Sequence, residues 1–193
     1  MWREICIAFI LLGFGPGNRS PHVELGVIRI VDVWVNTAET VPGKTVVAND
    51  CIVIYPGGNF HLERRKQIAG QAISSLAVYE STATDDQLRS LEAILTGGAV
   101  TSLPEYVPPK FPLSVPDFSL FHAQFTRSGH PVTLGYFYTA EPLSQAIISG
   151  VSPSVAKHWR DSKEVLEPLV EWFHDLEKAV PDSAAGKTAN LCK

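Results

Sequence analysis

Histidine and glutamate side chains are the residues of this chain that could do acid–base chemistry. The six histidines are His22, His61, His122, His130, His158 and His174. His61 and Glu63 are two residues apart, so in a β-strand both side chains would point to the same face. If His122 lies nearby, these groups and neighbouring carboxylates could form the site of a small secreted hydrolase. A catalytic triad is assembled in space, so the sequence leaves this possibility open.

A second pair, His174 and Glu177, is three residues apart in a helical pattern near the C-terminus. Such a pair supplies only half of a zinc site, which needs three or four ligands, and a solvated helix face explains it better. The sequence contains no G-x-S-x-G, no glycine-rich phosphate-binding motif and no H-E-x-x-H. It therefore predicts no catalytic residue, no metal site and no cofactor.

Two stretches could bind a partner, either a protein or a small molecule. Between residues 97 and 117 the chain has five prolines and the aromatic residues Tyr106 and Phe111, which would offer a stiff contact surface. The alternative is a crossover that packs both rings on the core. The run Arg64, Arg65 and Lys66 could bind an acidic partner, although strand alternation would split it between two faces, and a solvated edge of the sheet explains it better.

The overall composition bounds the class of protein. The chain is 45% hydrophobic and 19% charged, which indicates a globular domain. Its formal net charge of -4 argues against nucleic acid as a partner, because phosphate binding needs a surplus of Lys and Arg on one face. The sequence leaves the oligomeric state open.

The N-terminus has the pattern of an export signal. Residues 5–14 are almost wholly apolar and are followed by small and polar residues. Ten residues are too few to span a bilayer but suit the apolar part of a signal peptide. A buried N-terminal strand is one alternative, and a retained segment that acts as a membrane anchor is another. We expect a signal peptide at residues 1–20, a single α+β domain at 21–180 and a disordered tail at 181–193. The mature protein would be periplasmic or secreted, without a membrane span.

The chain has three cysteines, of which Cys6 would leave with the signal peptide. Cys51 and Cys192 would remain in an oxidising compartment, where disulfides form. Cys51 falls in an apolar strand and Cys192 in the predicted tail, so an unpaired Cys51 and an incidental Cys192 are favoured over a bridge. No C-x-x-C motif occurs, so neither a zinc knuckle nor a redox pair is predicted.

The clearest local pattern is a hairpin followed by a strand and a helix. If Gly57 and Gly58 form a two-residue turn, the expected cross-strand pairs are Tyr55 with Phe60, Val53 with Leu62, and Cys51 with Arg64. A third strand is expected at residues 76–80. The helix at residues 85–95 begins with a capping box, in which Thr84 is the N-cap and Gln87 the third helical residue.

The remaining elements complete the expected fold. Residues 23–35 read as one long strand or two short ones, and residues 118–139 as a second hairpin around 127–131. A helix begins at Ser152 and Pro153 and should be kinked or broken at Pro168. We therefore expect an α+β fold, in which an antiparallel sheet from two hairpins and flanking strands is covered by one central helix and a Pro-kinked C-terminal helix. The favoured function is a non-catalytic exported binding or interaction protein.

Overall fold

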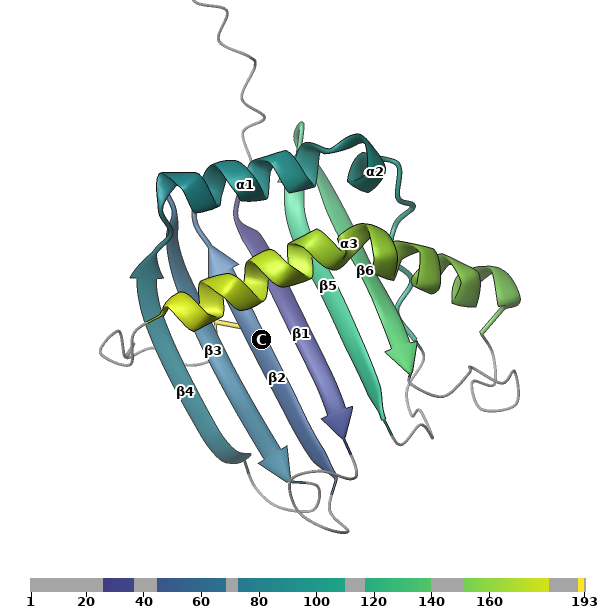
Figure 1. Ribbon diagram of the computed structural model, residues 1–193, viewed down its shortest axis with the longest axis horizontal. Helices are drawn as coiled ribbons and strands as arrows, with labels where there is room; N and C mark the ends of the chain where they lie inside the picture. Colours follow the sequence, from purple (N-terminus) through teal and green to yellow (C-terminus); the bar gives the residue numbers. More distant parts are fainter. Residues whose placement is uncertain are drawn as a thin grey trace, which may run out of the picture.

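A six-stranded antiparallel sheet with helices packed on one face forms the described part of the molecule (Figure 1). The computed structural model describes residues 26–36, 45–68, 73–109, 117–139, 151–180 and 191–192. The predicted signal peptide and Phe111 lie outside these ranges. So does the predicted C-terminal tail, except for residues 191–192.

The sheet confirms the predicted α+β class. Its spatial order is β4-β3-β2-β1-β5-β6, so the first strand lies in the middle and joins the two hairpins. The strands are β1 (Ile28–Asn36), β2 (Val46–Ile54), β3 (Asn59–Ile68), β4 (Ile73–Thr82), β5 (Phe118–Arg127) and β6 (His130–Thr139). Every neighbouring pair is antiparallel.

Within the described residues, three helices connect and cover the strands: α1 (Asp85–Thr96), α2 (Gly98–Thr101) and α3 (Pro153–Ala179). The predicted capping box of α1 is present, because Thr84 and Gln87 exchange side-chain and backbone hydrogen bonds. Ser152 caps α3 and Pro153 opens it, as expected. Pro168 lies inside α3, which continues past it, and Figure 1 shows that this helix changes direction along its length.

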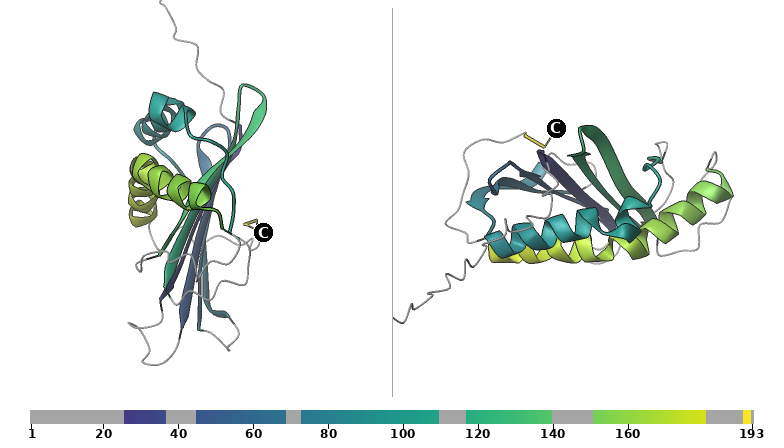
Figure 2. Two further views of the ribbon diagram at one scale, coloured as in Figure 1. Left: turned by 90° about the vertical axis from the view of Figure 1, so that its right-hand side faces the viewer. Right: turned by 90° about the horizontal axis from the view of Figure 1, so that it is seen from above.

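The main core lies between the sheet and α1 and α3. Because side chains alternate across a strand, one set from each strand faces the helices, and Ile30, Ile52 and Leu62 are completely buried there. Phe121 of β5 meets Phe173 of α3 edge-on, with ring centroids 6.5 Å apart. The two helices therefore cover one face of the sheet only (Figure 2).

The register of the first hairpin differs by one residue from the predicted register. Ile54 pairs with Phe60, Val53 with His61, Ile52 with Leu62 and Cys51 with Glu63. Gly58 N–H donates to the Tyr55 carbonyl, and Tyr55 N–H donates to the Asn59 carbonyl. Gly57 and Gly58 both have positive φ, 92° and 87°, so the turn consumes one residue more than a two-residue loop.

This one-residue slip exchanges the two faces of the hairpin, as expected for a side-chain period of two. Cys51 and Val53 were expected to share a face with Phe60 and Leu62. Instead they share the helix-free face with His61 and Glu63. The prediction of the second hairpin is confirmed, and its turn is a two-residue loop at Ser128 and Gly129, both with positive φ.

The helix-free face is partly covered by two segments that are distant in sequence. Figure 2 shows residues 191–192 on the side of the sheet opposite the helices. The segment after α2 runs along β6, where Tyr106 N–H donates to the Thr133 carbonyl at 3.0 Å, and its Tyr106 side chain reaches the same face. The Tyr106 ring stacks on His122, with centroids 6.3 Å apart.

Candidate functional site

The candidate site is built on β3, whose odd-numbered residues point to the helix-free face. His61, Glu63 and Arg65 therefore lie in a line along one strand, and Glu80 of β4 is the cross-strand partner of His61. His61 is 1% exposed and Glu63 is completely buried. A buried carboxylate on a sheet face is costly unless it is paired, so its partners define the site.

Three donors converge on the Glu63 carboxylate. His61 Nε2 lies 3.0 Å from Oε1, Arg65 Nε lies 3.1 Å from Oε2, and the Leu191 backbone N–H donates to Oε1 at 2.8 Å. Burial alone would raise the pKa of Glu63, but the hydrogen bonds from Arg65, His61 and Leu191 outweigh it and lower the pKa to about 2. Glu63 is therefore an anion at neutral pH and accepts from all three groups.

The end of the chain is fastened over this carboxylate by a disulfide between Cys51 and Cys192. The expectation that these cysteines stay unpaired is wrong. It treated residue 192 as part of a loose tail, whereas the Arg29 guanidinium also donates to the Cys192 carbonyl. The cross-strand partner of Cys51 is Glu63, so the bridge places Leu191 directly against the Glu63 side chain.

A pocket of about 500 Å³ opens beside this cluster, between the end of the first hairpin turn and β4. It is lined by Tyr55, Asn59, Phe60, His61, Glu80, Ser81, Thr82 and Leu191. Among the described residues, His61 Nδ1 has no hydrogen-bond partner although it is buried. Its nearest charged neighbour is Glu80 Oε1 at 3.6 Å, which is too far for a normal hydrogen bond.

The two histidines considered for a hydrolase share the helix-free face but do not meet. His122 of β5 pairs with Val31, Val31 with Cys51, and Cys51 with Glu63. His122 is thus three strands away from the His61 and Glu63 pair, or about 14 Å at the usual strand spacing. Burial, and to a lesser degree Arg29, lower the pKa of His122, which packs under Tyr106.

The basic run is divided between the two faces, as strand alternation predicts. Arg65 binds Glu63 on the helix-free face. Arg64 lies on the helix face, where it donates to the Glu177 carbonyl at 2.6 Å and stacks over the Tyr79 ring. Lys66 is exposed. These three basic residues therefore do not form one patch.

Tyr106, the other predicted contact residue, is 8% exposed. Gly135 lies directly beneath it, because a Cβ atom at this glycine would lie 3.0 Å from Tyr106 Cγ. Burial raises the pKa of the Tyr106 hydroxyl, which has no hydrogen-bond partner within the described ranges.

A second charged cluster lies between α3 and the sheet. Asp32, Asp50 and Arg64 are adjacent cross-strand partners on β1, β2 and β3, and α3 places His174 and Glu177 above them. His174 Nε2 is 3.0 Å from Asp32 Oδ2, and Arg64 Nε is 3.5 Å from Glu177 Oε1. The view of this pair as a solvated helix face is wrong for Glu177, which is buried.

The carboxylates of this second cluster are held in unusual states. Burial raises the pKa of Glu177 to about 7 and that of Asp50 to about 6, and repulsion from neighbouring carboxylates adds to both shifts while Arg64 opposes them. The hydrogen bond to Asp32 raises the pKa of His174. One signal in the sequence pointed here, namely the aspartates at positions 32 and 50 within largely apolar strands.

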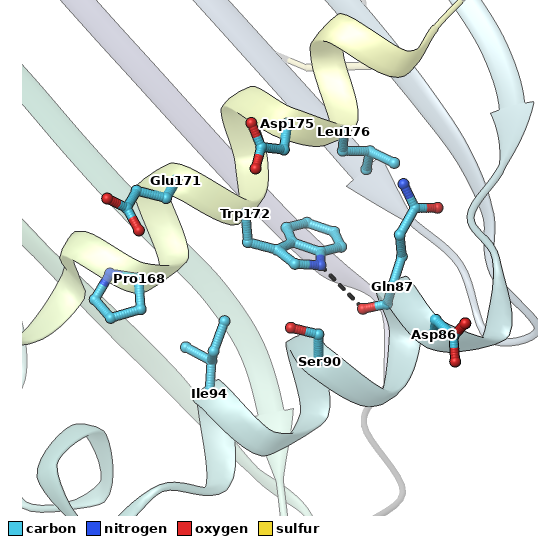
Figure 3. Close-up of a pocket in the computed structure, with 9 residues that line it drawn as sticks. All are labelled: Asp86, Gln87, Ser90, Ile94, Pro168, Glu171, Trp172, Asp175 and Leu176. Carbon is cyan, nitrogen blue, oxygen red and sulfur yellow. Dashed lines mark hydrogen bonds between the residues drawn. The ribbon is translucent and has the colours of Figure 1, made fainter.

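A groove of about 560 Å³ runs between α1 and α3 on the outer side of the helices (Figure 3). Trp172 forms its floor and donates from Nε1 to the Gln87 carbonyl at 2.9 Å. Asp86 and Asp175 on its rim are paired with Arg89 and Lys178. None of the unpartnered buried polar groups in the described part of the chain lines this groove, so the pocket beside His61 is the better candidate for a binding site.

Sequence comparisons assign no family to this arrangement. In the described residues, no group of three or more His, Cys, Asp or Glu side chains could hold a metal ion. No helix within those ranges is long and apolar enough to cross a membrane. Neither the protein-family models nor the curated proteins compared with the chain match it.

Proposed function

We propose that this chain is a non-catalytic exported binding protein, periplasmic or secreted, that holds a small molecule in the pocket between Tyr55, His61 and Glu80. The observation that carries the proposal is the unpartnered Nδ1 of buried His61 at this pocket. Buried polar atoms are nearly always hydrogen-bonded. A concave site with a few convergent polar groups is the usual form of a small-molecule site.

The disulfide supports the export part of the proposal. Cys51 and Cys192 are joined across 141 residues, and structural disulfides persist in oxidising compartments such as the periplasm or the extracellular space. The apolar segment at residues 5–14 is the matching signal in the sequence.

Mass spectrometry of the protein from its source cells tests export. We expect an N-terminus between residues 18 and 23, and we expect Cys51 and Cys192 to resist alkylation when the protein is denatured without a reductant. An intact Met1 with both cysteines alkylated, in a soluble cytosolic fraction, would contradict the proposal.

A binding role fits the pocket better than covalent catalysis does. His61 Nε2 is engaged by Glu63 and Nδ1 has no partner among the described residues, so no hydroxyl there is hydrogen-bonded to this imidazole. The Thr82 hydroxyl instead donates to Asn59 Oδ1 at 2.9 Å. Nucleophilic catalysis needs a nucleophile within hydrogen-bond reach of its base.

Binding is tested by screening a fragment library against the ¹⁵N-labelled protein by NMR. We expect the shifts caused by hits to gather on the amides of Tyr55, Asn59, Glu80 and Thr82. A library without hits, or shifts confined to the groove between α1 and α3, would overturn the assignment of this pocket.

A small secreted hydrolase is the second candidate. It is favoured by the His61 and Glu63 pair, because a carboxylate that orients one imidazole nitrogen leaves the other available as a general base. Hydrolysis of p-nitrophenyl esters that is lost in His61→Gln, in a variant that still folds, would support it. The binding proposal predicts no hydrolysis that depends on His61.

A further inference from the structure

We propose that the pocket recognises a primary ammonium group, which is held between His61 Nδ1 and the Glu80 carboxylate. This inference rests on the binding role proposed above and adds the chemical class of the ligand. It is carried by the two hydrogen-bond acceptors at the pocket, His61 Nδ1 and Glu80. The contact with Glu63 determines that Nδ1 is the acceptor nitrogen of a neutral His61.

The tautomer of a neutral His61 follows from its contact with Glu63. Glu63 is ionised and can only accept hydrogen bonds, and its Oε1 is 3.0 Å from His61 Nε2. The Nε2 atom must therefore carry the hydrogen. Since a neutral imidazole has one N–H, Nδ1 is a bare acceptor, and it is buried without a partner among the described residues.

A second acceptor lies beside Nδ1 at the wall of the pocket. Glu80 Oε1 is 3.6 Å away, and both residues line the pocket. A ligand nitrogen about 2.9 Å from each atom would satisfy both with normal hydrogen-bond lengths. An ammonium group has three hydrogens to donate, whereas a hydroxyl has one and a carboxylate has none.

The charge and the walls of the pocket favour the same ligand. The Glu80 side chain is 55% exposed and attracts a cation, whereas a carboxylate ligand would face repulsion from it. Tyr55 and Leu191 line the pocket with exposed fractions of 38% and 44%. They can cover the apolar body of an amine, and the Tyr55 ring can also attract its charge.

Three probes with four carbon atoms each test the inference: n-butylamine, 1-butanol and butyrate, each titrated into the ¹⁵N-labelled protein at pH 7. We expect butylamine to shift the His61 ring nitrogens and the Glu80 amide in a saturable way. The alcohol and the acid should bind at least tenfold more weakly. Glu80→Gln should weaken butylamine binding at least tenfold. Glu164→Gln, an exposed residue of α3 on the other side of the sheet, should leave it unchanged.

The outcomes separate this inference from the proposed function. If butanol or butyrate binds as well as butylamine, the pocket is a binding site but the ammonium inference is wrong. If these probes and the fragment library all fail to bind, both are wrong. If the free protein has hydrogens on both His61 ring nitrogens and butylamine causes no shift, a protonated His61 donates from Nδ1 towards Glu80 in place of a ligand. The inference is then overturned.

A second pair of probes distinguishes the possible sources of the ammonium group. Nα-acetyl-lysine amide and its Nε-acetylated form present the same side chain with and without the charge. Binding of the first but not the second supports the inference and indicates a lysine side chain. Binding of butylamine alone supports it and indicates a small free amine. Equal binding of the two lysine probes would contradict it.

Discussion

At the scale of single residues, Glu63 organises the helix-free face. It holds Arg65 and His61 of its own strand and the Leu191 backbone from the end of the chain. Because these donors keep the carboxylate ionised, Glu63 also determines which nitrogen of a neutral His61 carries a hydrogen. One buried carboxylate thereby links the disulfide-bound end of the chain to the proposed binding pocket.

Glu63 should make the stability of the protein depend on pH. Its pKa in the folded protein is about 2 and its usual value is 4.5, so its contribution is complete above about pH 4.5 and is lost as the pH falls towards 2. The shift corresponds to about 3 kcal/mol.

We expect Glu63→Gln to lower the free energy of unfolding at pH 7 by about 2–4 kcal/mol and to flatten the fall of this free energy below pH 4.5. Urea denaturation at pH 7 and pH 3 measures both effects. An unchanged acid profile, or an equal loss in Glu164→Gln, would contradict this role.

Gly135 is required where the segment after α2 crosses β6. A Cβ atom there would lie 2.5 Å from the Phe121 carbonyl oxygen and 3.0 Å from Tyr106 Cγ. We expect Gly135→Ala to lower the free energy of unfolding by about 1–3 kcal/mol, the usual cost of overpacking, and to increase the exposure of Tyr106. Gly98→Ala is the control, because nothing lies within 4 Å of its Cβ position. Thermal denaturation compares the stability of the two variants, NMR of the Tyr106 ring compares its exposure, and equal stability would contradict the steric argument.

At the scale of elements, α3 is attached to the sheet partly through groups that titrate near neutral pH. Burial raises the pKa of Glu177 to about 7 and of Asp50 to about 6, and the hydrogen bond to Asp32 raises the pKa of His174. All three groups stabilise the fold most when they are protonated. Each contribution is therefore largest below the ordinary pKa of its group. The contributions of Asp50 and Glu177 are lost as the pH rises through about 6 and about 7, and that of His174 is lost as the pH rises through its raised pKa.

Because the pKa values of these groups are raised, we expect α3 to be held more tightly on the sheet at pH 5 than at pH 8. We expect Glu177→Gln to be about 1–3 kcal/mol more stable than the wild type at pH 8, because a neutral amide avoids the buried charge. Glu171→Gln, exposed on the same helix, should have no such effect. Thermal denaturation at pH 5 and pH 8 tests this, and a wild type that is equally stable at both values would refute it.

Elements with local signals could be predicted from the sequence, and elements that depend on long-range pairing could not. The capping box at Thr84 and Gln87 and the start of α3 at Ser152 involve residues three positions apart or fewer. The predicted register of the first hairpin is wrong because two adjacent glycines are compatible both with a two-residue turn and with the longer turn that forms. A slip of one residue then assigned Cys51 to the wrong face.

The same distinction applies to the candidate site. His61 and Glu63 could be placed on one face because they are two residues apart on one strand. Glu80 reaches His61 only through the pairing of β3 with β4. Leu191 reaches Glu63 from 128 residues away, and no local pattern in the sequence predicts such a contact.

At the scale of the whole molecule, the two faces of the sheet are covered by different means. Helices α1 and α3 bury the apolar side chains of one face, whereas the other carries a smaller apolar cluster around Val31, Cys51 and Val53. There the disulfide, the hydrogen bond from Arg29 to the Cys192 carbonyl and the hydrogen bond from the Leu191 N–H to Glu63 hold the end of the chain in place. The pocket beside His61 therefore has a wall that depends on a covalent bond.

Removing this bond should affect both stability and the pocket. Closing a loop of more than 100 residues restricts the unfolded chain strongly, so we expect Cys51→Ala combined with Cys192→Ala to lower the free energy of unfolding by about 3–5 kcal/mol. Leu191 would no longer be fixed against Glu63, and the NMR signals of Tyr55 and Glu80 should shift.

Urea denaturation with and without dithiothreitol measures the effect of the disulfide on stability. The reductant should bring the wild type to the stability of the double variant and leave the double variant unchanged. A wild type that is indifferent to the reductant would show that the bridge does not hold the chain end, and the pocket wall would then need another origin.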